Sequence, residues 1–229
     1  MLEALRIEVL EANLEVVRRG LVIYTFGNAS AVDREQGLVA IKPSGVPYEK
    51  MTPAHMVITD LEGRAVEGSL RPSSDLATHI AIYRAFPAIG GIVHTHSRHA
   101  TAWAQAGREI PCFGTTHADY FHGPVPVTRQ LTAAEIEADY EGNTGVAIVE
   151  LMQNREPLAT PGVLVAGHAP FCWGRTAAEA AHNAVVLEYL AAMALETLAI
   201  NPSAPPISEA QLNKHYFRKH GPKATYGQG

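Results

Sequence analysis

The chain has 229 residues, of which 47% are hydrophobic and 18% charged, and its net charge is −5 at pH 7. This composition is typical of one folded domain and excludes an intrinsically disordered or collagen-like chain. The charged fraction lies below the average of about 25%, which favours partial coverage of the surface by partner subunits.

The first half of the chain predicts one helix followed by short strands. Apolar residues between Leu2 and Val17 recur at helical spacing, and Gly20 follows them as a stop signal. Short β-branched stretches predict neighbouring strands at 21–25 and 38–42, and a hairpin of 57–59 with 65–66.

In the second half of the chain, helices alternate with single strands. Ser73 or Ser74 can cap a helix, and Thr132 and Thr176 each stand three residues before a glutamate, as in a capping box. A proline-rich break at 202–206 leads into a polar tail. The expected elements are a helix at 75–86, a strand at 91–97, a helix at 132–140, a strand or helix at 146–151, a strand at 163–165 and a helix at 176–200.

Membrane insertion, secretion and nucleic-acid binding are not expected. The N-terminus lacks the basic start of a signal peptide, and His182, Glu188 and Glu196 interrupt the most apolar helix. The two cysteines are too few for a disulfide framework and fit a reducing, cytoplasmic location. No dense run of basic residues resembles a phosphate-backbone binding surface, except for a short cluster near Arg218.

Three histidines and one aspartate are candidate metal ligands. His94 and His96 stand two residues apart in an expected strand, where alternation would point both imidazoles to one face. The alternative is a pair of ordinary polar residues, because H-x-H alone is a weak signal. His168 follows another expected strand, and Asp75 starts a helix, where its carboxylate could instead stabilise the helix dipole.

Several short turns could bind a phosphate. Ser73 and Ser74 precede a helix N-terminus, and the run from Lys42 to Gly45 combines a cation, a hydroxyl and backbone amides. Gly27 and Asn28 form a further turn. The alternative for each of these turns is a purely structural role without a ligand. Because no G-x-G-x-x-G or P-loop motif occurs, the group predicts a small phosphorylated ligand rather than a nucleotide.

Long stretches of the chain resemble the class II sugar-phosphate aldolase/epimerase family. The matching motifs occur in the family's order along essentially the whole chain. They are Gly27 with Asn28, 41–46, 72–75, 91–103, 114–121, 161–174 and 214–228. The resemblance implies a single α/β domain over 1–229, with a central, mainly antiparallel sheet flanked by helices. The tail from about 207 to 229 would complete the site.

The resemblance also implies roles for individual residues. His94, His96, His168 and Asp75 would bind Zn²⁺, with Mn²⁺ or Co²⁺ as alternatives. Asp119 and Tyr226 would be the acid/base residues. The substrate and its phosphate would contact Gly27, Asn28, Lys42, Ser44, Gly45, Ser73 and Ser74, and the supporting residues would be Thr115, Glu141, His215 and Arg218.

The expected activity is interconversion of L-ribulose 5-phosphate and D-xylulose 5-phosphate in pentose catabolism. This reaction could serve the breakdown of arabinose or of ascorbate. Aldolase members carry glutamate at the position of Asp75, so aspartate favours the epimerase branch. The alternatives are an aldolase that cleaves a ketose 1-phosphate such as L-fuculose 1-phosphate, and a sugar-phosphate binding protein without turnover. The family further implies a homotetramer with sites between subunits.

Overall fold

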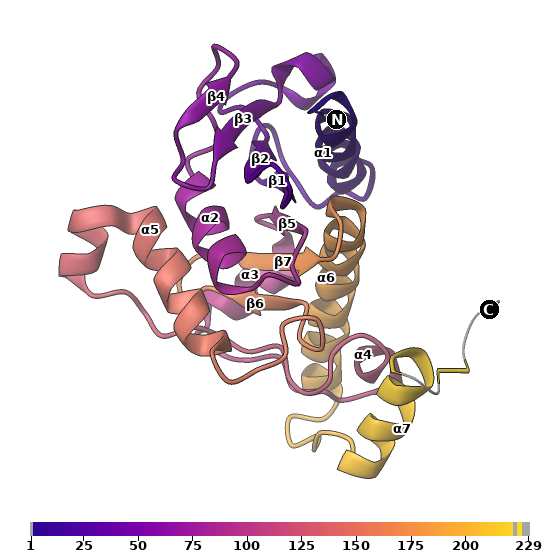
Figure 1. The fold of residues 1–229 in the computed structure, drawn as a ribbon. Coiled ribbons are helices and arrows are strands. Elements are labelled where there is room, and N and C mark those ends of the chain that lie inside the picture. The colour runs from indigo at the N-terminus through magenta and orange to yellow at the C-terminus, as the bar shows by residue number, and fades with distance from the viewer. Residues whose placement is uncertain (1, 222–223, 226–229) are drawn as a thin grey trace.

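A computed structural model describes residues 2–221 and 224–225 of the chain. This part of the chain contains seven helices and seven strands, with the first four strands grouped after the first helix (Figure 1). The helices are α1 (Leu2–Arg18), α2 (Leu76–Ala85), α3 (Arg98–Gln105), α4 (Thr115–Ala118), α5 (Ala133–Met152), α6 (Ala177–Ile200) and α7 (Glu209–Lys219), with short 3₁₀ turns η1 (Tyr48–Lys50) and η2 (Pro53–His55). The strands are β1 (Asn28–Asp33), β2 (Leu38–Ile41), β3 (Val57–Asp60), β4 (Ala65–Glu67), β5 (Gly91–His94), β6 (Gly162–Leu164) and β7 (Pro170–Gly174).

The strands form one sheet in the order β4-β3-β2-β1-β5-β7-β6, and every neighbouring pair is antiparallel. Strands β1 to β4 pair in sequence order, whereas β5 is inserted between β1 and β7 from later in the chain. The pairing sets His94 at the end of β5 opposite Asn28 of β1 and Phe171 of β7. The predicted fold class, an α/β domain around a mainly antiparallel sheet, is confirmed.

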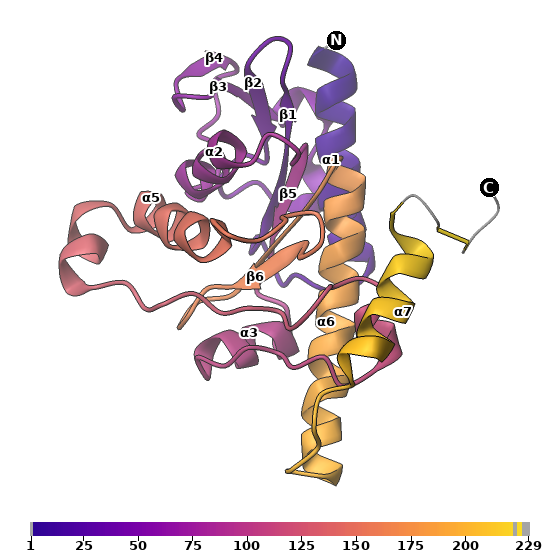
Figure 2. The same cartoon turned by 60° about the horizontal axis from the view of Figure 1, so that its bottom comes forward.

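Helices cover both faces of the sheet. Helices α1 and α6 pack on one face, and α2 with α5 lies on the other (Figures 1 and 2). Alternate residues of a strand pack on opposite faces of the sheet, because successive side chains of a strand point to opposite sides. On β5, Val93 joins the core under α1 and α6, while Ile92 joins the core under α2 and α5.

Several local predictions need correction. Residues 21–25 form a loop that ends in a turn rather than a strand, and β1 begins only at Asn28. The strand predicted at 91–97 ends at His94, and the segment 146–151 is helical as part of α5. Helices α3, α4 and α7 and strand β7 were not predicted, and α7 lies within the expected polar tail.

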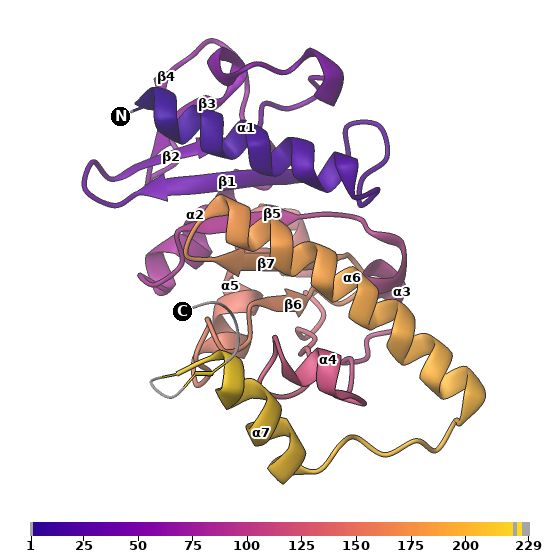
Figure 3. The same cartoon turned by 90° about the vertical axis from the view of Figure 1, so that its right-hand side faces the viewer.

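Helix α6 is the one described helix that is long and apolar enough to cross a membrane by length and composition. Its small residues, among them Ala180, Ala184 and Ala191, are buried against α1 and the sheet. Figure 3 shows α1 and α6 running in a similar direction on the sheet, α1 over β1 and β2 and α6 over β5 and β7. These contacts are those of a core helix in a folded domain, so length and composition are weak evidence for a span.

A buried histidine outside the candidate site predicts loss of stability in acid. Burial lowers the pKa of His117 to about 4, although its Nε2 donates to the Gly123 carbonyl at 2.9 Å. Below the unfolded pKa of about 6.5 the unfolded chain binds a proton that the folded chain excludes, so stability falls as pH falls. Between pH 7 and pH 5 this histidine should cost about 2 kcal/mol.

Urea unfolding at both pH values would measure this cost. His117→Gln should lose less stability than the wild type between pH 7 and pH 5, and the exposed control His182→Gln should lose as much as the wild type. An equal pH-dependent loss in His117→Gln and the wild type would contradict the prediction.

Candidate active site

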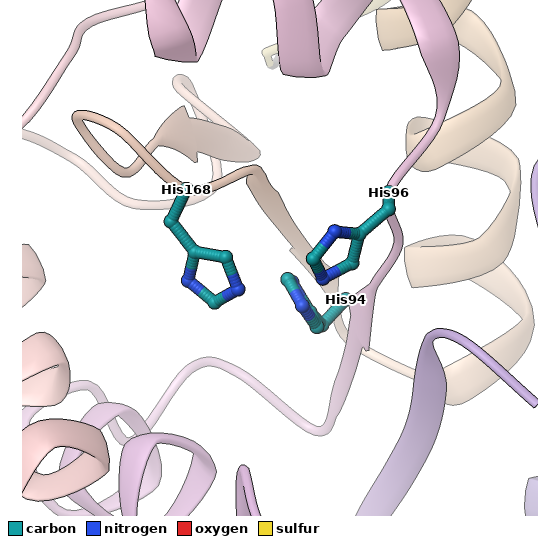
Figure 4. A group of neighbouring side chains, drawn as sticks. All are labelled: His94, His96 and His168. Carbon is teal, nitrogen blue, oxygen red and sulfur yellow. The ribbon is translucent and has the colours of Figure 1, made fainter.

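His94, His96 and His168 form one cluster of imidazoles at the end of β5 (Figure 4). Their ring centroids lie 4.8–5.0 Å apart. One potential ligand atom from each lies within 4.8 Å of the others. The expected shared strand face is wrong, because β5 ends at His94 and His96 lies in the following loop. The loop nevertheless brings His96 to the other two rings.

The cluster is in the protonation state that binds a metal. Burial lowers the pKa of His94 to about 3 and also lowers those of His96 and His168, so the imidazoles are neutral at neutral pH. The carbonyl of Pro170 accepts a hydrogen bond from His94 Nδ1 at 2.9 Å. A carbonyl cannot donate, so Nδ1 carries the proton and Nε2 keeps its lone pair for a ligand.

Asp75 points toward the same cluster. It occupies the N-cap position of α2, yet its side chain makes no capping hydrogen bond. Instead, its Oδ2 accepts from Asn28 Nδ2 at 2.6 Å and lies 4.0 Å from His94 Nε2. The cap predicted at Ser73 or Ser74 is wrong, because Asp75 is the N-cap residue of α2. At this position the Asp75 carboxylate can interact with the helix dipole and also face the histidines. Three neutral imidazoles and one carboxylate are a donor set that fits Zn²⁺ or a related divalent ion.

Two turns form the other side of this pocket. The backbone N–H of Ser73 donates to the Lys42 carbonyl at 2.9 Å, and that of Ser44 donates to the Arg71 carbonyl at 2.9 Å. The turns therefore lie together, and both line a pocket of about 380 Å³ that also contains the histidines, Asp75 and Glu141. A hollow of about 630 Å³ shares Ser73 and Ser74 with this pocket, and one of about 600 Å³ lies between α1 and α6, but the histidine cluster lines neither of them.

Lys42 is a buried cation within the pocket. It is 2% exposed, its Nζ lies 3.3 Å from the Thr25 carbonyl, and it stands 4.8 Å above the Tyr48 ring. Burial lowers its pKa, and the negative charge of Asp75 opposes this effect. Among the described residues, the hydrogen-bond and ring contacts of this ammonium are to carbonyls and an aromatic ring. It is suited to receive an anion, because an anion would compensate its desolvation.

Gly27 is required by the backbone geometry beside the cluster. Its φ is +78°, and a Cβ at this position would lie 2.8 Å from the His94 carbonyl oxygen. A larger residue would therefore push β1 away from β5 at the point where Asn28 reaches Asp75.

Other predicted site residues form a second cluster, between α4 and α7. Asp119 accepts hydrogen bonds from His215 Nδ1 and Arg218 at 3.1 Å, and Lys219 Nζ lies 3.3 Å away. Burial alone would raise the pKa of Asp119, but the bonds from Arg218 and His215 lower it. Thr115 starts α4 beside this cluster.

Among the described residues, none of the Asp119 cluster lines the pocket that contains the histidines. Within one chain, the pocket with the histidines is not lined by Thr115, Asp119, His215 or Arg218. Tyr226 lies outside the described residues.

Tyr140 is a pocket residue that the sequence did not predict. It lines the pocket beside Glu141, and its ring centroid lies 5.9 Å from that of His168. The sequence signal that could have indicated Tyr140 is the preceding Asp139. Aspartate is typical of helix N-caps, yet this one stands in the middle of a helical stretch.

Residues 7–195 match the family described as Class II Aldolase and Adducin N-terminal domain. The chain is 55% identical over 227 residues to L-ribulose-5-phosphate 4-epimerase UlaF of Salmonella paratyphi C and of Salmonella typhi, which covers 99% of this chain and 100% of each relative.

Solved structures share the fold at lower identity. An L-fuculose 1-phosphate aldolase superposes with a TM-score of 0.82 at 23% identity, covering 94% of this chain and 95% of the other. L-fuculose-1-phosphate aldolase from Thermus thermophilus superposes with a TM-score of 0.66 at 21% identity, covering 89% and 98%. With the family match over most of its length, the chain belongs to the class II aldolase family.

Proposed function

We propose that this chain is a metal-dependent L-ribulose-5-phosphate 4-epimerase, which interconverts L-ribulose 5-phosphate and D-xylulose 5-phosphate. The observation that carries the proposal is one pocket that joins His94, His96, His168 and Asp75 to the turns around Lys42 and Ser73. The 55% identity to epimerases supports epimerisation over aldol cleavage, which is the activity of solved aldolases that match this chain at 23% identity or less.

The chemistry of C4 explains why an epimerase would use an aldolase pocket. The hydrogen on C4 is β to the carbonyl at C2 and is not acidic, so direct deprotonation cannot invert this carbon. Cleavage of the C3–C4 bond, rotation of the aldehyde fragment and re-addition to its other face would invert it. A divalent metal, Zn²⁺ with Mn²⁺ and Co²⁺ as alternatives, would supply Lewis-acid polarisation of the C2 and C3 oxygens.

The residues of the chain would hold the two fragments and move the proton. Lys42, Ser44, Gly45, Ser73 and Ser74 would retain the phosphate, so that the aldehyde fragment rotates without leaving. In the cleavage step a base takes the C4 hydroxyl proton as the C3–C4 bond breaks. In the return step an acid on the other side protonates the new C4 oxygen.

We assign these two proton-transfer roles to Asp119 and Tyr226, and we propose that they come from a neighbouring subunit. The absence of Asp119 from the lining of the histidine pocket in one chain supports a site at a subunit interface. The homotetramer that we propose for this assembly follows from the family resemblance. Gly27, Asn28 and Glu141 would contact the sugar from the chain that holds the metal, while Thr115, His215 and Arg218 would support Asp119. The free Cys112 and Cys172 are compatible with a cytoplasmic enzyme of pentose catabolism.

A coupled assay on L-ribulose 5-phosphate, with and without a chelator, tests the proposal. We expect D-xylulose 5-phosphate to form without release of trappable aldehyde, and we expect the chelator to stop its formation. Absence of xylulose from metal-loaded protein would contradict the proposal. Cleavage of L-fuculose 1-phosphate with release of dihydroxyacetone phosphate would instead identify an aldolase.

A further inference from the structure

Helix α5 is broken where it passes the histidine cluster. Asp139 adopts φ −167° and ψ 91°, an extended conformation inside an otherwise helical segment. Its Oδ1 accepts a hydrogen bond from the Gly142 N–H at 3.0 Å, which is the geometry of an N-cap. The break therefore starts a second helical segment at Tyr140, the residue that faces the pocket.

Contacts with α2 hold this second segment in place. Thr78 Oγ1 donates to the carbonyl of Glu141 at 2.7 Å, and Gly145 approaches α2 so closely that a Cβ there would lie 2.6 Å from Ala81 Cβ. Because α2 begins next to Asp75, the same helix positions both the carboxylate of the pocket and the start of the segment that carries Tyr140.

His168 differs from His94 in how its ring is held. His94 Nδ1 is bound to the Pro170 carbonyl, whereas the buried Nδ1 of His168 has no hydrogen-bond partner among the described residues. Packing must therefore orient the His168 ring. His94, His96 and Phe171 contact it from β5, its following loop and β7, and Tyr140 contacts it from α5 at 5.9 Å with the rings inclined by 50°.

We propose that Tyr140 is a positioning residue whose ring packs against His168 and holds that imidazole in the orientation needed to bind the metal. The capped break at Asp139 in turn holds Tyr140 in place. This inference rests on the metal site of the proposed function. Loss of a group that orients a metal ligand typically weakens metal affinity by about 10–100-fold, and we expect this range for loss of the ring.

Titration of the purified full-length chain with Co²⁺, read by visible absorption, and competition with Zn²⁺ would test the proposal without an activity assay. Tyr140→Leu should weaken Co²⁺ binding by about 10–100-fold and alter the absorption spectrum, because one imidazole loses its fixed orientation. Tyr140→Phe keeps the ring and should bind like the wild type. Tyr189→Leu, at an exposed tyrosine of α6, is the matched control.

The cap provides an independent variant that leaves the tyrosine in place. Asp139→Ala should also weaken Co²⁺ binding, and Asp139→Asn, which retains a capping oxygen, should restore it. Thermal unfolding of each metal-free variant would separate altered binding from altered folding.

Wild-type affinity in both Tyr140→Leu and Asp139→Ala would overturn the inference while leaving the metal site in place. Equal weakening in Tyr140→Phe and Tyr140→Leu would also overturn it, because the hydroxyl rather than the ring would then be responsible. Failure of the wild-type chain to bind Co²⁺ or Zn²⁺ would instead contradict the proposed function itself.

Discussion

His96→Asn is expected to abolish metal binding and epimerase activity together. His96 is one of the three imidazoles whose ligand atoms lie within 4.8 Å of one another, and asparagine offers no ring nitrogen at that point. Loss of a direct ligand should weaken affinity by more than the roughly 100-fold that marks the upper range for outer-shell changes. Metal analysis after dialysis, combined with the coupled assay, would measure both effects on one sample.

His182→Asn is the matched control, because this exposed histidine on α6 is outside the cluster. It should retain metal and activity at wild-type levels. Full metal stoichiometry and affinity in the His96→Asn protein would show that His96 is not a ligand.

Asp119→Asn is expected to retain the metal but lose activity by about 10²–10⁴-fold, the usual contribution of a positioned acid or base. Asparagine keeps the shape of the side chain but cannot accept the C4 hydroxyl proton. Tyr226→Phe should behave in the same way. Steady-state kinetics beside metal analysis would check both variants, and near-normal turnover in either protein would remove that residue from the proton-transfer step.

Mixed assemblies of the two inactive variants would test whether the site spans two subunits. If Asp119 acts in a neighbour's pocket, co-expression of His96→Asn with Asp119→Asn chains restores about a quarter of the sites in a cyclic tetramer. If both groups act within one chain, every site retains one defect and activity does not return. The separately purified variants, assayed without mixing, are the control.

Elements with strong local signals were predicted well. Thr132 and Thr176 each cap the start of a helix as predicted, and the hairpin around Gly63 pairs β3 with β4. The capping box is complete only at Thr132, because the Glu179 carboxylate accepts from the Arg175 N–H rather than from that of Thr176. The strand at 21–25 was wrong because its β-branched residues favour a strand locally, while β1 needs Asn28 at its start to pair with His94.

Long-range contacts explain what the sequence could not predict. Helix α7 has a largely polar sequence, and distant residues hold it in place. Arg218 and Lys219 contact Asp119, which lies 99 residues before Arg218, and the buried Tyr216 packs against His122. The break at Asp139 depends on how α5 meets α2. The candidate metal ligands could be proposed from residue types and resemblance, but their proximity follows from β5 lying between β1 and β7.

The sheet order also has a consequence for how the chain folds. Strands β1 to β4 are neighbours in sequence, whereas pairing of β1 with β5 and of β5 with β7 closes long loops, and such non-local pairing slows folding. Asn28 and Asp75 belong to the part of the chain before β5, whereas His168 comes just before β7. The complete set of candidate ligands therefore comes together only after the last strands have joined. A metal held by this set would stabilise the native state alone, and the melting temperature would then rise with metal concentration.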